Sequence, residues 1–315
     1  MTERQFDQGT VIFREKDEGD SLFLITDGSV GVYSGYGSDS EEKIAELKAG
    51  DYFGEMALLE GYPRSATVVA LSAVKAEEVA AKEVIDYFKE KPETLLSIMK
   101  QLSQRIRKTT EDYQEVSQTI TQVKDEGKKE NVMGKLKKFA SIYRSRKAIA
   151  NGISAEVKRQ TDEFNHPDGA QGNTETYKKG TVIFKEGESG TCLYAVHFGK
   201  IGIYKGYGTP QEEKLTEITS NNFFGEMGMI EKLPRSATAV ALEPDTFVEL
   251  FYENDLLRIY KENPRTIEMI MGHFCNRLRK ITREYLKACE VAAKVEESGE
   301  EAAKDFKPST TVAAM

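Results

Sequence analysis

Two segments of the chain combine a carboxylate, a glycine and an arginine at the same spacing. They read FGEMALLEGYPRSATVVA at 53–70 and FGEMGMIEKLPRSATAVA at 224–241. In each segment a glutamate, Glu55 or Glu226, follows a glycine, and an arginine, Arg64 or Arg235, lies nine residues further on, directly after a proline. Arginine is the side chain best suited to holding a phosphate through two hydrogen bonds at once, and a carboxylate accepts hydrogen bonds from ligand hydroxyls. The spacing therefore predicts a site for a compact sugar phosphate.

The residues around these side chains have properties that suit an anion site. The letters FGEM predict the start of a short helix, where glycine allows close backbone approach and free amides attract an anion. Small residues after the arginine let amides and hydroxyls reach the same anion. The candidate binding residues are Phe53, Gly54, Glu55, Met56, Ala57, Arg64, Ser65, Ala66, Thr67, Phe224, Gly225, Glu226, Met227, Gly228, Arg235, Ser236, Ala237 and Thr238. We assign no catalytic residues and no metal ligands.

Both segments belong to a longer duplication. Residues 9–71 align without a gap to residues 180–242, and 31 of these 63 positions are identical by our count. Identity of this extent over one constant offset indicates a tandem repeat of one domain. Asn221 and Asn222 replace Gly50 and Asp51 ahead of the second motif, and we expect the turn to survive because asparagine tolerates a positive φ.

The composition of each copy predicts an α+β fold. Short runs of Val, Ile, Tyr and Phe between regularly spaced glycines are typical of a small antiparallel β-barrel or jelly roll. The pattern then becomes helical, and Pro92 and Pro264 each precede a long predicted helix. We predict a first domain at 1–123, a basic helical linker at 124–165, a second domain at 166–295 and a mobile tail at 296–315.

The predicted linker differs in charge from the rest of the chain. Residues 124–160 hold 11 Lys or Arg against 4 Asp or Glu, whereas the whole chain of 315 residues has a net charge of −8. Apolar residues recur at helical spacing in this stretch, which predicts an amphipathic basic helix. They are Met133, Leu136, Ala140 and Tyr143.

Composition excludes several classes of protein. The chain is 39% hydrophobic and 30% charged, which is typical of a globular protein, and no apolar run approaches the length of a membrane span. The opening residues MTERQFDQGT have no apolar core, so we expect no secretory signal and a cytoplasmic protein. Three cysteines and three histidines are too scattered for a disulfide framework or a metal site. They are Cys192, Cys275, Cys289, His166, His197 and His273.

Both motif segments resemble the phosphate-binding cassette of cyclic nucleotide-binding domains. This family includes the regulatory subunits of cyclic-AMP-dependent protein kinase, the catabolite activator proteins and cyclic-nucleotide-gated channels. The resemblance implies that Glu55 and Glu226 bind the ribose 2′-hydroxyl. It also implies that Arg64 and Arg235 bind the cyclic phosphate, together with the backbone near Gly54, Ala66, Gly225 and Ala237.

The resemblance implies a non-enzymatic sensor that binds two cyclic nucleotides and responds by rearranging helices. It also implies that the sensor acts on a protein effector, which the sequence does not identify, and that the chain needs no cofactor. In the family, alanine after the cassette arginine goes with cyclic AMP and threonine with cyclic GMP. Ser65 and Ser236 stand there, so we favour cyclic AMP and keep cyclic GMP open. The alternatives are a scaffold whose basic linker docks on an acidic partner and, ranked last, a DNA-binding regulator.

The long predicted helices carry apolar residues alternately three and four apart, the pattern of a coiled-coil seam. The first seam is Met99, Leu102, Ile106, Thr109, Tyr113, Val116, Ile120 and Val123; the second is Met271, Phe274, Leu278, Ile281, Tyr285, Ala288, Ala292 and Val295. Each seam spans about 36 Å at about 1.5 Å per residue, more than one small barrel can cover. Three arrangements stay open: the helices pair within one chain, they pair between chains, or each folds back on its own barrel.

Overall fold

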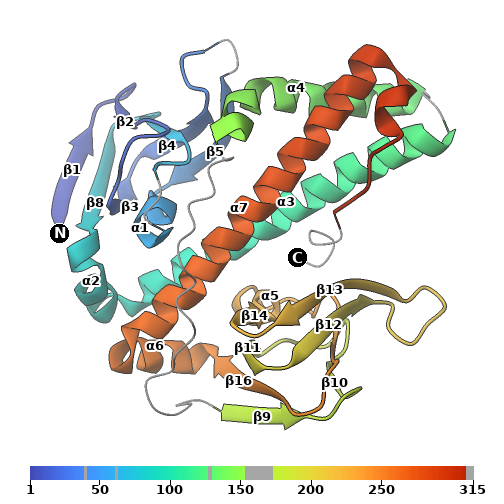
Figure 1. Ribbon diagram of the computed structural model, residues 1–315. Helices are drawn as coiled ribbons and strands as arrows, with labels where there is room; N and C mark the ends of the chain where they lie inside the picture. The colour runs from blue at the N-terminus through green and yellow to red at the C-terminus, as the bar shows by residue number, and fades with distance from the viewer. Residues whose placement is uncertain (39–40, 61–62, 127–129, 153–172, 310–315) are drawn as a thin grey trace. The chain divides into compact units, whose positions relative to one another are not determined.

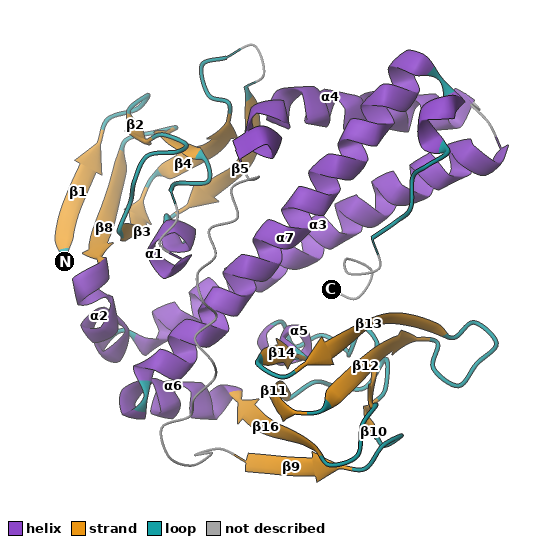
Figure 2. Cartoon of the chain, in the orientation of Figure 1, coloured by secondary structure: helices purple, strands orange, loops and turns teal. Residues whose placement is uncertain are grey.

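We analysed a computed structural model of the chain, which describes residues 1–38, 41–60, 63–126, 130–152 and 173–309 (Figure 1). Both copies of the repeat fold into antiparallel sheets and then helices, as the colouring by element type shows (Figure 2). The expected α+β class is confirmed.

The first copy contains eight strands in two four-stranded sheets, with strand orders β1-β8-β3-β6 and β2-β7-β4-β5. The strands are β1 (Thr2–Phe6), β2 (Val11–Phe13), β3 (Ser21–Asp27), β4 (Ser29–Ser34), β5 (Glu42–Lys48), β6 (Tyr52–Phe53), β7 (Thr67–Ala70) and β8 (Val74–Ala80). A short helix α1 (Glu55–Glu60) lies in the chain between β6 and β7. All described strand pairs of this copy are antiparallel.

The second copy repeats this plan, with strand orders β14-β11-β16-β9 and β10-β15-β12-β13. Its strands are β9 (Asn173–Tyr177), β10 (Val182–Phe184), β11 (Cys192–Phe198), β12 (Lys200–Lys205), β13 (Glu213–Thr219), β14 (Asn222–Phe224), β15 (Thr238–Ala241) and β16 (Thr246–Tyr252). The counterpart of α1 is α5 (Glu226–Ile230). Each position in one strand order has its repeat partner in the other, so the duplication extends to the topology.

The two sheets of a copy share one apolar core. In the second copy a single buried cluster joins residues of β11 and β16 to residues of β12 and β15. Phe23 and Phe53 of the first copy stack with ring centroids 4.9 Å apart, and Tyr194 and Phe224 stack equivalently at 4.8 Å. The sheets therefore pack face to face. Among the described strands the pairings stay within each four-stranded sheet, so closure into a barrel stays a prediction.

The turn before the second motif survives its substitution. Gly50 has a φ of 94° and Asn221, its counterpart, has a φ of 65°. Both residues thus adopt the left-handed conformation that glycine and asparagine tolerate best. The expectation from the sequence is confirmed.

Helices follow the sheets of each copy. The first copy continues with η1 (Ala81–Glu83), α2 (Val84–Glu90) and the long α3 (Pro92–Glu126), and the second with α6 (Glu253–Glu262) and the long α7 (Pro264–Ser298). Pro92 and Pro264 are the first helical residues, where a missing amide hydrogen costs nothing. All predicted seam residues are buried except Thr109, which is half-buried.

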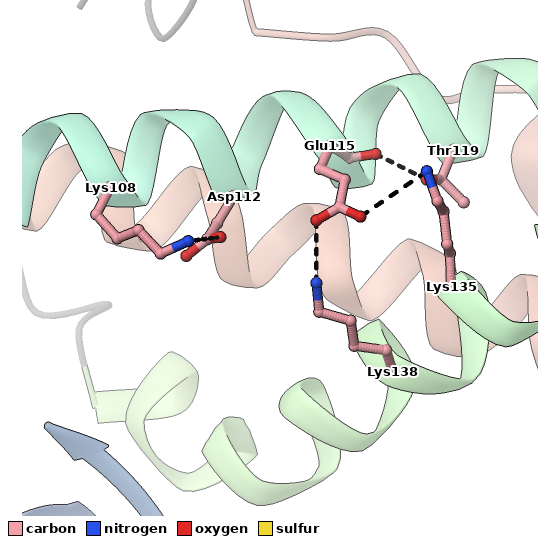
Figure 3. Close-up of polar contacts among 6 residues, drawn as sticks. All are labelled: Lys108, Asp112, Glu115, Thr119, Lys135 and Lys138. Carbon is pink, nitrogen blue, oxygen red and sulfur yellow. Dashed lines mark hydrogen bonds and ion pairs between the residues drawn. The ribbon is translucent and has the colours of Figure 1, made fainter.

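The basic segment forms helix α4 (Glu130–Gly152), as its periodicity predicts. Its buried residues include Leu136 and Ala140, which were expected, and Val132 and Phe139, which were not. On its polar side Lys138 Nζ lies 3.0 Å from Glu115 Oε2 of α3, and Lys135 Nζ lies 3.9 Å from Glu115 Oε1 (Figure 3). Residues 153–160 of the predicted basic stretch lie outside the described part of the chain.

The described residues divide into two compact units that do not follow the order of the sequence. One contains residues 1–98, 108–152 and 275–308, and the other contains residues 99–107 and 173–274. Each unit therefore holds the sheets of one copy together with a segment of the other copy's long helix. The domain boundaries drawn from the sequence are not tested by this division and stay a prediction.

Helical structure continues past residue 295 at the C-terminal end of the described chain. Helix α7 continues to Ser298, and a 3-10 turn η2 (Glu300–Ala303) follows. Ala303 is fully buried, and Lys124 Nζ donates to the carbonyl oxygen of Phe306 at 3.5 Å. The segment expected to be a mobile tail, 296–315, therefore begins with helical residues, and its mobility stays a prediction. Residues 310–315 lie outside the described part of the chain.

Candidate functional site

Each candidate site begins where a short strand gives way to a short helix. In the first copy β6 ends at Phe53, Gly54 follows and α1 starts at Glu55. Gly54 has a φ of 84° and its counterpart Gly225 a φ of 78°, a conformation that favours glycine. Glu55 and Glu226 are thus the first residues of their helices, as predicted, and both are buried.

Arg64 reaches back from the strand side of the loop to the start of the helix. Its Nη1 donates to the carbonyl oxygens of Ser21 at 2.7 Å and Gly54 at 3.0 Å, and its Nη2 donates to Ser21 Oγ at 3.1 Å. The guanidinium lies over the Phe13 ring, 4.2 Å from its centroid. A Cβ at Gly19 would come 2.1 Å from Arg64 Nε, so only glycine leaves room for this arginine.

Arg235 has the same arrangement in the second copy. Its Nη1 donates to the carbonyl oxygen of Gly225, and its Nη2 donates to the carbonyl oxygen of Cys192 at 2.9 Å. Its guanidinium lies 4.3 Å from the centroid of the Phe184 ring. A Cβ at Gly190 would come 2.9 Å from Arg235 Cζ. The two sites thus match in backbone and in the aromatic face beneath the arginine.

Both arginines are buried cations that form no ion pair with a carboxylate in the part of the chain that the structure describes. Each is 5% exposed, and within the described residues neither forms an ion pair. The Nε atom of each is also buried and has no hydrogen-bond partner. Burial lowers the pKa of the Arg64 guanidinium, and the nearby Asp20 and Glu55 carboxylates oppose that shift. A buried charge costs free energy unless it is paired, so both sites are built to receive an anion.

The copies differ in the residues that flank the arginine. Asp20, whose charge acts on Arg64, has Thr191 as its counterpart, and Ser21 has Cys192. In the second copy Lys205 Nζ donates to the carbonyl oxygen of Ser236 at 3.0 Å. The two sites therefore share their main groups but differ in local charge.

Of the other candidate residues, Met56 is buried and Met227 is half-buried, and the remaining ten fall into three groups. Phe53 and Phe224 point into the aromatic core described above, and Ala57, Ala66 and Ala237 are buried beside the cassette. Thr67 Oγ1 accepts a hydrogen bond from the amide of Glu15 at 3.0 Å, and Thr238 Oγ1 accepts one from the amide of Glu186 at 3.0 Å. Ser65 and Ser236 are exposed, and Gly228 packs against Gly190.

The sequence reasoning missed the residues that hold the arginine. Ser21 and Cys192 supply carbonyl oxygens from 43 positions away, and Phe13 and Phe184 supply the aromatic face. The sequence does mark the two phenylalanines, because Phe13 and Phe184 are each the last residue of the repeated motif VIF. Repetition alone does not separate a core aromatic from one that contacts the arginine.

The described part of the chain contains neither a membrane-spanning helix nor a cluster of metal ligands. No described helix combines the length and the apolar character needed to cross a bilayer. No group of three or more potential metal ligands was found within the described ranges. Cys192, Cys275 and Cys289 are all buried.

Both candidate sites lie in segments that match a known protein family. The model of the cyclic nucleotide-binding domain matches residues 3–91 and 174–263. The cAMP-dependent protein kinase regulatory subunit of Candida albicans is 26% identical over 246 residues, covering 77% of this chain and 40% of the relative. The human cGMP-dependent protein kinase 2 is 22% identical over 246 residues, covering 78% of this chain and 25% of the relative.

A solved structure described as cAMP bound PfPKA-R (141-441) is 21% identical, with a TM-score of 0.34, and covers 90% of this chain and 80% of that chain. This chain spans less than half the length of the Candida relative. The family model covers more than half of the chain and includes both cassettes. The chain therefore belongs to the cyclic nucleotide-binding domain family and carries two copies of that domain.

Proposed function

We propose that this chain is a non-enzymatic regulatory sensor with two cyclic nucleotide sites, one in each copy. The observation that carries the proposal occurs in both copies: a buried glutamate starts a helix, and a buried arginine of the same cassette forms no ion pair with any described carboxylate. The glutamate would accept a ribose hydroxyl and the arginine would hold the cyclic phosphate. The eighteen residues predicted from the sequence are proposed as the two binding cassettes.

We favour cyclic AMP as the ligand. Ser65 and Ser236 occupy the position at which the family distinguishes the two nucleotides, and both are exposed. The regulatory subunit of Candida albicans supports cyclic AMP, and the human cGMP-dependent kinase keeps cyclic GMP as the alternative. No cofactor enters this proposal.

The response would pass through the long helices to a protein effector. Each compact unit contains segments of both α3 and α7, and the seam residues of both helices are buried in a single chain. This supports pairing of the two seams within one chain. We retain residues 1–123 and 166–295 as the two binding domains, 124–165 as the linker, and a cytoplasmic location.

Titration calorimetry with cyclic AMP and cyclic GMP tests the proposal directly. We expect two sites per chain for cyclic AMP. Arg64→Ala and Arg235→Ala should each abolish or weaken one site by about 2–5 kcal/mol, because each removes a buried partner of an anionic ligand. Arg64→Lys keeps the charge but loses the forked donors of the guanidinium. Its affinity at the first site should therefore lie between that of the parent chain and that of Arg64→Ala. A chain that binds neither nucleotide would refute the proposal.

An acidic binding partner for the basic linker has less support. Lys135 and Lys138 pair with Glu115, and Arg144 Nη2 lies 2.7 Å from Glu296 Oε2 and 3.0 Å from Glu297 Oε1. These cations are therefore engaged by acidic groups of their own chain. The described helices give no support to the hypothesis of a DNA-binding regulator. It stays less favoured than the sensor and the scaffold.

A further inference from the structure

The residue that caps the end of the second cassette helix is held by the long helix of the first copy. Glu231 closes α5, and its amide donates to the carbonyl oxygen of Met227 at 3.0 Å. Its side chain is only 3% exposed. Ser103 Oγ donates to Glu231 Oε1 at 2.8 Å, and Arg107 Nη2 lies 2.7 Å from Glu231 Oε2.

This contact lies within one compact unit. Residues 99–107 of α3 belong to the same unit as the second copy's sheets and cassette. Ser103 and Arg107 are four residues apart, so they lie on one face of the helix. Ser103 is 1% exposed and buries its hydroxyl against Glu231. The Glu231 carboxylate therefore meets two groups from the other copy: Oε1 accepts the Ser103 hydrogen bond, while Oε2 forms an ion pair with Arg107 but accepts no hydrogen bond.

A second contact involves the next residue along the chain. Lys232 has a φ of 57° and pairs with Glu253, the first residue of α6. The chain leaving the cassette is thus held chiefly by α3 through the buried Glu231, and the pair of the exposed Lys232 with Glu253 adds little to this restraint. Since α5 spans only five residues, restraint at its end restrains Glu226 at its start.

We propose that Ser103 and Arg107 are positioning residues for the second nucleotide site, acting through Glu231. The inference rests on the proposed function of that site. By fixing the end of α5, the pair holds Glu226 ready for the ribose, and preorganisation of this kind raises affinity. Coupling is reciprocal, so a nucleotide in the second site must in turn stabilise residues 99–107 of α3.

The test uses the full chain with the first site silenced by Arg64→Ala, so that every signal belongs to the second site. Adding Arg107→Gln should weaken cyclic AMP binding by about tenfold, within the usual range of coupling effects. Arg107→Lys should recover most of the loss. Glu231→Gln should match Arg107→Gln, and the double variant should be no weaker than either, because the two residues act as one pair. Lys108→Gln is the matched control, since Lys108 pairs with Asp112 on α3 itself.

Hydrogen exchange separates positioning from simple stabilisation. Cyclic AMP should slow amide exchange in residues 99–107 of the Arg64→Ala chain, and this protection should disappear with Arg107→Gln. If Arg107→Gln disrupts folding, Ser103→Ala removes only the hydrogen bond from the hydroxyl to the carboxylate, keeps the ion pair, and should still weaken binding by about threefold.

Three results would overturn the inference. Second-site affinity that is unchanged or tighter in Arg107→Gln, even with a lower melting temperature, would leave the pair a purely structural contact. A nucleotide that binds the Arg64→Ala chain without protecting α3 would exclude the linkage. A parent chain that binds no cyclic nucleotide would refute the proposed function, and the inference with it.

Discussion

The guanidinium of Arg64 lies face-on over the ring of Phe13, with Cζ 4.2 Å from the ring centroid. The second copy repeats this relationship between Arg235 and Phe184 at 4.3 Å. A ring face carries partial negative charge and attracts a cation without neutralising it. The arginine is thus held in a buried position while its charge stays available to an anion.

Replacing Phe13 with leucine should weaken the first site selectively. A cation–π contact contributes about 0.5–2 kcal/mol, which corresponds to roughly two- to thirtyfold in affinity. Phe184→Leu is the matched variant and should weaken the second site instead. Two-site calorimetry with cyclic AMP measures both. If neither variant changes the affinity of its own site, the ring does not position the arginine for binding.

Much of the site could be predicted because its residues are close together in the sequence. Glu55 and Arg64 are nine residues apart, and the duplication showed which spacing matters. The groups that hold Arg64 could not be predicted, because Ser21 is 43 residues away and contributes a backbone carbonyl that any residue type would supply. Sheet packing, which local patterns do not encode, brings them together.

In the fold, too, the features set by neighbouring residues could be predicted, whereas those set by tertiary packing could not. Strands, helix starts at Pro92 and Pro264, and the seam all follow from local periodicity and turn chemistry. The exchange of helix segments between the two units does not, since a heptad pattern states that a face is buried but not what covers it. The burial of Ala303 was missed for a similar reason, because one alanine after a helix has no periodicity.

Threonine at the position after each arginine should shift the ligand preference. In the family, threonine there hydrogen-bonds the guanine amino group, and one hydrogen bond contributes about 0.5–1.5 kcal/mol. Ser65→Thr with Ser236→Thr should therefore raise cyclic GMP affinity roughly two- to tenfold. The control, Ser65→Ala with Ser236→Ala, should leave cyclic AMP binding nearly unchanged. Competition at equal concentrations measures the preference, and tenfold tighter cyclic GMP binding by the parent chain would contradict our choice of ligand.

Neutralising Glu115 should expose the positive charge of α4. Glu115→Gln removes the partner of Lys135 and Lys138, so the chain should elute from heparin at a higher salt concentration. Asp112→Asn is the matched control, because it changes the net charge equally but frees only Lys108 of its own helix. Equal shifts for the two variants would show that Glu115 does not restrain the lysines of α4.

Aspartate at Ile120 should destabilise the chain without changing its mass in solution. Ile120 is fully buried in the unit that also contains the C-terminal half of α7. A carboxylate placed there would lose its hydration without gaining a partner, which should cost at least about 3 kcal/mol. For a chain of 315 residues that corresponds to a melting temperature lower by roughly 5 °C.

The matched control is Gln118→Asp, which introduces the same charge at an exposed position two residues earlier on the same helix. Light scattering on a sizing column and a thermal melt together decide among the arrangements of the seam. A destabilised chain of unchanged mass supports pairing within one chain. Loss of a dimer would instead assign the seam to pairing between chains, and a variant that changes neither mass nor melting temperature would show that the seam is not an interface. We expect the first result, because the seam residues of both long helices, apart from half-buried Thr109, are already buried within a single copy of the chain.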